Sequence, residues 1–186
     1  MEKIEKKENH LLEILQTRKA KYVVGTLLLS GIGIALPRIF HILAGSSAGA
    51  TFLPMHIAVL IAALTFGALS ASIVGGTSVV CSYLLTGMPT LTRLPYMAIE
   101  LVIYAVLLCI LNKKFNSYIS LIATIVFGRV IYAGVLFVAI NVIGLQTYGI
   151  SVIESIKTGL PGIVFQLVCI PFIAKLLNER LNLKND

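Results

Sequence analysis

Apolar residues gather in six long runs, and short polar or glycine-rich segments separate each run from the next. A helix that crosses the hydrocarbon core of a bilayer needs about 20 apolar residues, and most of the runs come close to that length. The pattern therefore predicts an all-α integral membrane protein, a bundle of six transmembrane helices. The helices are expected at residues 22–43, 54–66, 68–85, 95–111, 118–143 and 152–177.

Prolines, glycines and other small residues mark the expected ends and contacts of these helices. Pro37 followed by Arg38 predicts an interruption of the first helix, because proline removes a backbone donor and clashes with the preceding turn. The segment 44–51 is too rich in glycine, serine and alanine to stay a regular helix. Almost nothing joins the second and third helices, and their many small residues predict a compact hairpin with close backbones.

The composition identifies lipid as the solvent of this chain. Of its 186 residues, 58% are hydrophobic and 12% are charged, and the mean hydropathy is +0.95. Soluble domains carry roughly 25% charged residues, and a soluble core of this size has no use for so much apolar surface. After six spans little length remains, so we expect no large extramembrane domain.

The net charge of +7 comes largely from basic residues at the expected membrane boundaries. Of the 15 Lys and Arg residues, six precede the first span, two lie at 113–114 and three close the chain. With six spans these positions fall on one side of the membrane, which the positive-inside rule makes cytoplasmic. The basic excess therefore indicates orientation and contact with anionic lipid, and it argues against nucleic acid as a partner.

The expected organisation is a cytoplasmic amphipathic lead-in at 1–20, a membrane domain at 21–178 and a cytoplasmic tail at 179–186. The charged lead-in is unlike a signal peptide, which would place an apolar segment there. Cys81, Cys109 and Cys169 lie in different apolar segments without metal-ligand spacing, as small hydrophobic residues do. The chain has no nucleotide-binding G-x-x-x-x-G-K-[ST], no H-E-x-x-H and no G-x-S-x-G. We therefore expect no metal, no cofactor and no enzymatic activity.

Two polar residues of the fourth helix are the first candidates for a site. Charge in hydrocarbon persists where it is paired, hydrated or used. Glu100 and Tyr104 are four residues apart and share one face of the helix, where they can accept and donate hydrogen bonds to a polar ligand. The alternative is structural, with the Glu100 carboxylate tying its helix to Arg93 or Arg129.

Further candidates lie on the neighbouring helices. Arg129 stands near the middle of the fifth helix and Gln166 at a similar depth in the sixth. The donors of arginine hold carboxylates, phosphates or ring acceptors, and the alternative is a clamp from Arg129 to Gln166 or to backbone carbonyls. His56, in the first turn of the second helix, would line an outer site, although histidines near helix ends are more often interfacial. Arg93 would guard the entrance.

Five short motifs follow one another along the chain. They are Phe52-Leu53-Pro54-Met55-His56-Ile57, Leu84-Leu85-Thr86-Gly87-Met88-Pro89, Ile99-Glu100-Leu101 with Tyr104, Phe127-Gly128-Arg129, and Gly159-Leu160-Pro161-Gly162 leading to Gln166-Leu167. In this order, on six short helices, the set resembles the substrate-binding S component of energy-coupling-factor (ECF) vitamin transporters. The resemblance covers about residues 20–180.

The resemblance implies a subunit of the bacterial plasma membrane that captures a small water-soluble vitamin or a precursor from outside. Such a subunit neither hydrolyses ATP nor pumps alone; it docks on a transmembrane coupling (T) subunit with two ATPases. The loop between the first two helices would act as a gate, here with Gly45, Ser46, Ser47 and Gly49. Docking would use small residues of the first helix, here Gly31 and Ala35. The ligand contacts expected are Glu100, Tyr104, Arg129, Gln166, His56, Arg93, Thr51 and Asn141.

The ligand and the mechanism each leave alternatives open. Arg129 suits an anionic vitamin such as pantothenate or a folate-like compound, whereas Glu100 with Tyr104 suits a pyridine or pyrimidine such as vitamin B6. The alternatives to a capture subunit are a self-sufficient small carrier or channel, and an intramembrane enzyme that uses Glu100 or His56 as acid or base.

Overall fold

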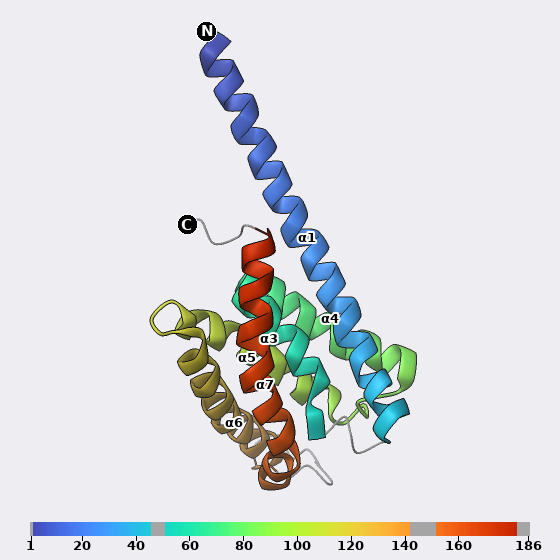
Figure 1. The fold of residues 1–186 in the computed structure, drawn as a ribbon. Helices are drawn as coiled ribbons and strands as arrows, with labels where there is room; N and C mark the ends of the chain where they lie inside the picture. Colours follow the sequence, from blue (N-terminus) through green and yellow to red (C-terminus); the bar gives the residue numbers. More distant parts are fainter. Residues whose placement is uncertain (1, 46–50, 142–151, 182–186) are drawn as a thin grey trace.

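The computed structural model describes residues 2–45, 51–141 and 152–181, and in these ranges the regular structure is entirely helical. Six helices form one bundle (Figure 1). Their bounds are α1 Glu2–Ala44, α3 Pro54–Phe66, α4 Ala68–Thr86, α5 Leu94–Asn112, α6 Ser117–Asn141 and α7 Val152–Leu181. The predicted all-α architecture is confirmed, and most helix ends lie close to those expected from the apolar runs.

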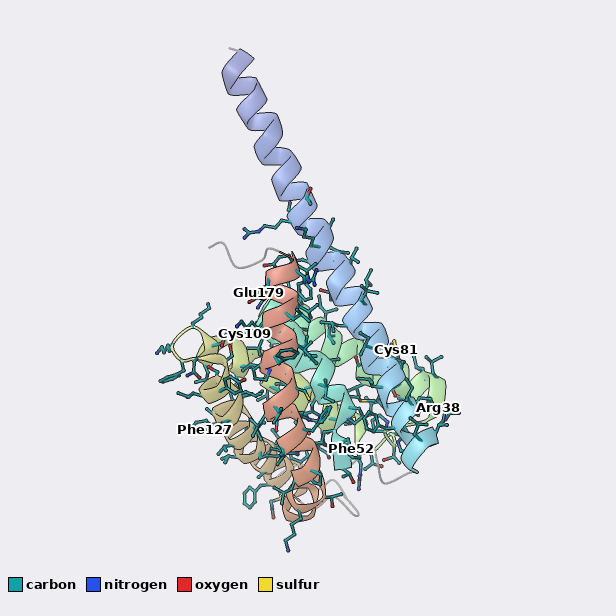
Figure 2. The ribbon with its side chains drawn as sticks, in the orientation of Figure 1. Arg38, Phe52, Cys81, Cys109, Phe127 and Glu179 are labelled. Atoms are coloured by element: carbon teal, nitrogen blue, oxygen red, sulfur yellow. The ribbon has the colours of Figure 1, made fainter. Side chains whose placement is uncertain are left out.

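Five of the helices are long and apolar enough to cross a membrane. Their apolar stretches are Thr17–Leu43, Ala68–Thr86, Leu94–Asn112, Ser117–Val135 and Lys157–Leu181. Large apolar side chains cover the outside of the bundle, such as Phe127 on α6, which is 55% exposed (Figure 2). In water such a surface would be a liability, whereas against lipid tails it is ordinary. The chain is a multi-pass membrane protein.

The shortest helix, α3, is the central one. All 13 of its residues are buried, and α1, α4, α5 and α7 pack around it. At 1.5 Å per residue it is about 20 Å long, well below the ~30 Å of a hydrocarbon core. A helix that other helices cover on every side meets no lipid, so its length need not match the bilayer. The expected six full spans become five helices of spanning length and one short central helix.

Two aromatic contacts show that α3 still connects the same two levels of the bundle as α1. Phe40 of α1 packs on Phe52 before α3, with ring centroids 5.1 Å apart. At the other end of α3, Phe66 packs on Tyr22 of α1, with centroids 5.6 Å apart. The short helix therefore runs between the levels of α1 that Tyr22 and Phe40 mark.

The N-terminal part of α1 and the C-terminal end of α7 lie at the same end of the bundle (Figure 1). Lys21 Nζ donates a hydrogen bond to the carbonyl of Leu181 at 3.1 Å, which joins α1 to the last residue of α7. The last helix is longer than its apolar run predicts, and it includes the first residues of the expected tail at 179–186. The fifth helix, expected to reach 143, is described to Asn141.

The expected interruption of the first helix at Pro37 is wrong. The helix α1 is continuous from Glu2 to Ala44 with Pro37 inside it, and the lead-in at 1–20 is its first part, which projects past the bundle (Figure 1). Proline removes the hydrogen bond to the carbonyl four residues earlier, that of Gly33. Pro37 and Gly33 are both buried, so packing of this face against other helices offsets the lost bond.

A single residue, Gly67, joins α3 to α4, which confirms the predicted tight hairpin. Gly67 has φ 86°, and its N–H donates to the carbonyl of Ala62 at 3.1 Å. Glycine adopts this φ without the clash that a side chain would cause. Further along α4, Gly75 lets α5 approach closely, since a Cβ added there would lie 3.1 Å from Leu101 Cβ.

Small and hydroxyl-bearing residues line the contact between α1 and α4. Thr77 Oγ1 and Ser30 Oγ are 3.1 Å apart, within hydrogen-bond distance. A Cβ added at Gly33 would lie 3.1 Å from Ser78 Cβ and 3.4 Å from Ala58 Cβ. At Gly33 the backbone of α1 therefore lies close against α4 and α3.

Gly31 and Ala35, the expected docking residues, lie on the exposed face of the same helix. A Cβ added at Gly31 would meet no heavy atom within 4 Å. The small residues of α1 thus serve two faces, with Gly33 turned to the bundle and Gly31 and Ala35 turned away from it.

Replacing Gly33 with leucine is expected to overpack the contact between α1 and α4 and to destabilise the protein by about 1–3 kcal/mol. Gly31→Leu is the matched control, because it makes the same change two residues away against open space. Thermal unfolding of both purified variants in one detergent measures the difference. Equal unfolding temperatures for the two variants would contradict the close packing at Gly33.

Candidate functional site

Glu100 and Arg129 form a buried ion pair in the middle of the bundle. Arg129 Nη1 of α6 donates a hydrogen bond to Glu100 Oε1 of α5 at 2.9 Å, and their side chains are 8% and 7% exposed. An uncompensated charge at this depth is strongly destabilising, whereas each member of the pair neutralises the other. Of the structural alternatives for Glu100, the structure contains the tie to Arg129.

Helical spacing brings the pair together. Buried positions spaced three and four residues apart form one stripe on each helix, and α5 packs on α6 along them. The stripe on α5 comprises Tyr96, Glu100, Leu101, Tyr104, Ala105 and Leu108. The stripe on α6 comprises Ser120, Leu121, Thr124, Ile125, Gly128 and Arg129.

His56 of α3 completes a group of four, named here the buried cluster: His56, Glu100, Tyr104 and Arg129. His56 Nε2 lies 3.6 Å from Glu100 Oε1, longer than a hydrogen bond but close enough for electrostatic interaction. The imidazole meets the Tyr104 ring edge to face, with centroids 5.2 Å apart and planes at 87°, a favoured aromatic geometry. His56 is 2% exposed, and neither ring nitrogen has a hydrogen-bond partner among the described residues.

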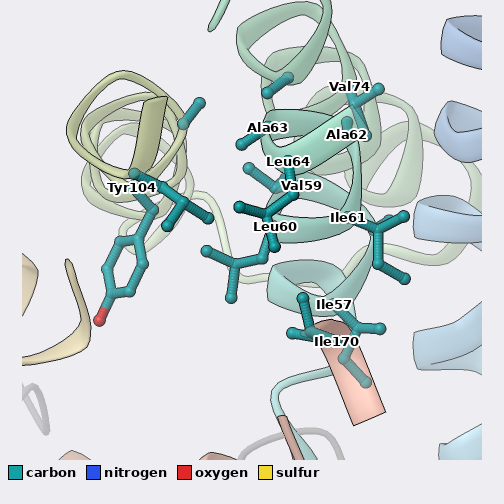
Figure 3. Close-up of a cluster of buried hydrophobic side chains, with 14 of the residues drawn as sticks. Ile57, Val59, Leu60, Ile61, Ala62, Ala63, Leu64, Val74, Tyr104 and Ile170 are labelled. Atoms are coloured by element: carbon teal, nitrogen blue, oxygen red, sulfur yellow. The ribbon is translucent and has the colours of Figure 1, made fainter. Parts of the chain in front are cut away.

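A glycine on α6 makes room for the ring of Tyr104. A Cβ added at Gly128 would lie 2.7 Å from Cε2 of that ring, so any larger residue would displace it. The Tyr104 hydroxyl lies 3.5 Å from the carbonyl of Ile125. In Figure 3 the ring lies beside the aliphatic side chains of α3, and its hydroxyl is directed away from them. The hydroxyl therefore leaves the hydrocarbon core and reaches polar atoms.

Gln166 of α7 holds the start of α3. Its Nε2 donates to the carbonyl of Leu53 at 3.4 Å, and the backbone N–H of His56 donates to the same carbonyl at 3.0 Å. Leu53 has φ 49° and ψ 50°, a left-handed conformation that is unfavourable for leucine and needs support from its surroundings. Gln166 therefore helps to position His56 through the backbone of Leu53.

Thr51 is the second predicted site residue at this junction. It is half-buried, and the backbone of Thr51 and Phe52 lies against Gly162 of α7. A Cβ added at Gly162 would lie 2.8 Å from the carbonyl carbon of Phe52. The backbone of Thr51 takes part in this contact, which joins the segment before α3 to α7.

Two other predicted contacts lie outside the buried cluster. Arg93 is exposed and precedes α5, about 10 Å along the helix axis from Glu100. Asn141 is exposed at the end of α6, where its Nδ2 donates to the carbonyl of Phe137 at 2.9 Å. Asn141 is about 18 Å along the axis from Arg129.

Of the four residues of the predicted gate loop, the structure describes Gly45. Gly45 is exposed directly after α1, with φ 82°. Ser46, Ser47 and Gly49 lie outside the described residues.

Two positions that shape the buried cluster carry little signal of their own in the sequence. Gly128 stands in a motif beside Arg129. That this glycine leaves space for the Tyr104 ring depends on how α5 packs on α6. Leu53 precedes Pro54, and a residue before proline avoids the helical region, so the sequence favours an irregular backbone at Leu53. The sequence does not predict the hydrogen bond of Leu53 with Gln166, more than a hundred residues away.

The chemistry available at the buried cluster is hydrogen bonding and charge pairing. Across the described ranges, no group of three His, Cys, Asp or Glu side chains is placed to hold a metal ion. Cys81, Cys109 and Cys169 are free, and Cys109 Sγ lies 3.2 Å from the carbonyl of Ala63. Comparisons of the chain with family models, with curated proteins and with solved structures found no match. Fold and site together define a multi-pass helical membrane protein with a buried polar cluster.

Breaking the ion pair from either side is expected to cost stability. Glu100→Gln and Arg129→Gln each leave one uncompensated buried charge, so each should lower the free energy of unfolding by about 3–5 kcal/mol. The double variant should lose less than the sum, because it leaves no lone charge. Unfolding of the four proteins in one detergent measures this coupling.

The exposed pair Lys175–Glu179 provides the control for that cycle. Its atoms are 4.0 Å apart, and its side chains are 74% and 61% exposed. Exposed pairs contribute little, so Lys175→Gln and Glu179→Gln should add without measurable coupling. Additive effects at Glu100 and Arg129 as well would contradict the ion pair.

Proposed function

We propose that the protein is a solute-binding subunit of the energy-coupling-factor type, which captures a small water-soluble vitamin or a precursor. The observation that carries the proposal is His56, a buried imidazole whose Nε2 lies 3.6 Å from Glu100 Oε1 and whose Nδ1 has no hydrogen-bond partner among the described residues. Folded proteins satisfy nearly all buried polar atoms. An unsatisfied nitrogen beside an ion pair therefore favours a site that a ligand completes.

The position of the buried cluster supports capture from outside the cell. His56 lies in the first turn of α3 and Glu100 in the second turn of α5, near the end of the bundle that carries Phe52 in Figure 2. Lys21 and Leu181 meet at the opposite end. Because the basic residues concentrate at that opposite end, the positive-inside rule assigns the cluster to the outer half of the membrane.

The absence of a nucleotide-binding motif from the sequence supports a division of labour between subunits. We assign ATP hydrolysis to two partner ATPases and their attachment to a transmembrane coupling subunit in the bacterial plasma membrane. Gly31 and Ala35 are exposed on α1, and small residues let a partner helix approach closely. We propose this face of α1 as the docking surface.

Native mass spectrometry of the gently purified protein, followed by thermal unfolding against water-soluble vitamins, tests the capture. One co-purifying vitamin that raises the unfolding temperature is expected. The rise should vanish in Glu100→Gln and persist in Glu179→Gln, which changes an exposed glutamate in the same way. Absence of a bound compound, together with no shift across the whole panel, would contradict the proposal.

Reconstitution into liposomes separates a capture subunit from the other two classes. The protein alone is expected to bind the vitamin without net uptake, and uptake should need the coupling subunit, the ATPases and ATP. Gly31→Leu should then reduce uptake and leave binding unchanged. Uptake by the protein alone would favour a self-sufficient carrier or channel, and chemical conversion of the vitamin would favour an intramembrane enzyme.

A further inference from the structure

We infer that the buried cluster selects an uncharged heterocycle that donates a hydrogen bond to Nδ1 of His56, and that His56 is the specificity-determining contact. This selection rests on the solute-binding function proposed above and narrows its ligand to one chemical class. Three properties of the cluster lead to it: the charge balance of its ion pair, the unpartnered Nδ1 of His56, and the aromatic ring of Tyr104 beside it.

The ion pair of the buried cluster is already electrically balanced. Glu100 contributes one negative charge and Arg129 one positive charge, 2.9 Å apart. The charges of the pair therefore sum to zero. A ligand with a net charge would bring an uncompensated charge into a site shielded from water, which is strongly unfavourable.

An anionic ligand would also compete with Glu100 for Arg129. The carboxylate of Glu100 is covalently held at hydrogen-bond distance from the guanidinium, whereas a ligand carboxylate would first have to lose its own hydration. Arg38, Arg93 and Lys157 are exposed and lie outside the buried cluster. None of these three side chains is buried with the cluster to compensate the charge of an anion held there.

His56 leaves one ring nitrogen to a ligand. Its Nε2 lies 3.6 Å from Glu100 Oε1, whereas Nδ1 is buried without a hydrogen-bond partner among the described residues. A carboxylate only accepts, so an N–H at Nε2 suits Glu100 and leaves Nδ1 as an acceptor for a donor of the ligand. Amide-bearing or hydroxyl-bearing nitrogen heterocycles offer such a donor without a net charge.

The surroundings of the cluster favour an apolar ring as the body of that ligand. The Tyr104 ring meets the imidazole of His56 edge to face, with centroids 5.2 Å apart. Tyr104 belongs to the hydrophobic core of the bundle. Small-molecule sites typically combine apolar walls with a few placed polar groups, so an aromatic heterocycle fits better than a chain rich in hydroxyls.

Matched compound pairs that differ in charge test the selection directly. Nicotinamide against nicotinate and pyridoxine against 4-pyridoxate compare uncharged rings with anionic rings of similar shape, and pantothenate adds an anion without an aromatic ring. Calorimetric titration of the purified protein is expected to show the uncharged member of at least one pair binding at least about 100-fold more tightly. Each anionic partner should bind weakly or not at all.

Substitutions of His56 test its role with the compound that binds. His56→Phe keeps a ring against Tyr104 but removes both nitrogens, so binding should weaken by about 10- to 100-fold. His56→Gln keeps a donor and an acceptor and should retain more affinity than His56→Phe. His41→Phe, which changes a half-buried histidine near the end of α1, is the matched control and should bind normally.

Thermal unfolding without ligand separates a ligand contact from a structural role. Replacing the imidazole by phenylalanine removes the 3.6 Å interaction with Glu100 and the unsatisfied Nδ1 together, and it keeps a ring against Tyr104, so the unfolding temperature should change little. A lower unfolding temperature for His56→Phe with unchanged affinity would overturn the role of His56. A preference for the anionic members would overturn the charge selection and leave vitamin capture intact. Binding of none of the compounds, with no vitamin co-purifying, would contradict the proposed function and the selection with it.

Discussion

A buried carboxylate and a buried guanidinium must stay paired, because either one alone would be an uncompensated charge. This constraint governs how the helices in the middle of the bundle pack. Glu100 and Arg129 are buried on different helices, so α5 and α6 must pack in the register that holds the two groups in contact. A shift by one turn would leave two lone charges in a medium of low dielectric constant, which is far costlier than the loss of an ordinary contact. The ion pair therefore selects the packing of its helices.

The short central helix α3 brings the third polar group to this pair. Because every residue of α3 is covered by other helices, His56 is buried beside Glu100 and Tyr104 instead of lying at the interface with water. The start of α3 is held by Gln166 through the carbonyl of Leu53. The central position that frees α3 from matching the bilayer thus also excludes water from His56.

The proposed capture function draws on two features of the buried cluster. The ion pair supplies a fixed electrostatic environment, and the imidazole of His56 supplies a buried nitrogen, Nδ1, without a hydrogen-bond partner among the described residues. Both are features of recognition by hydrogen bonding, which is why the proposal above is a binding subunit.

The sequence by itself determined the membrane class, the approximate bounds of the helices, the tight hairpin at Gly67 and the candidate residues Glu100 and Arg129, because hydropathy, glycine conformation and the cost of buried charge act locally. The tertiary structure alone decided that α1 continues through Pro37, that α3 is central and that Glu100 pairs with Arg129. These outcomes depend on which helix faces pack together, and apolar runs look alike whether they face lipid or protein.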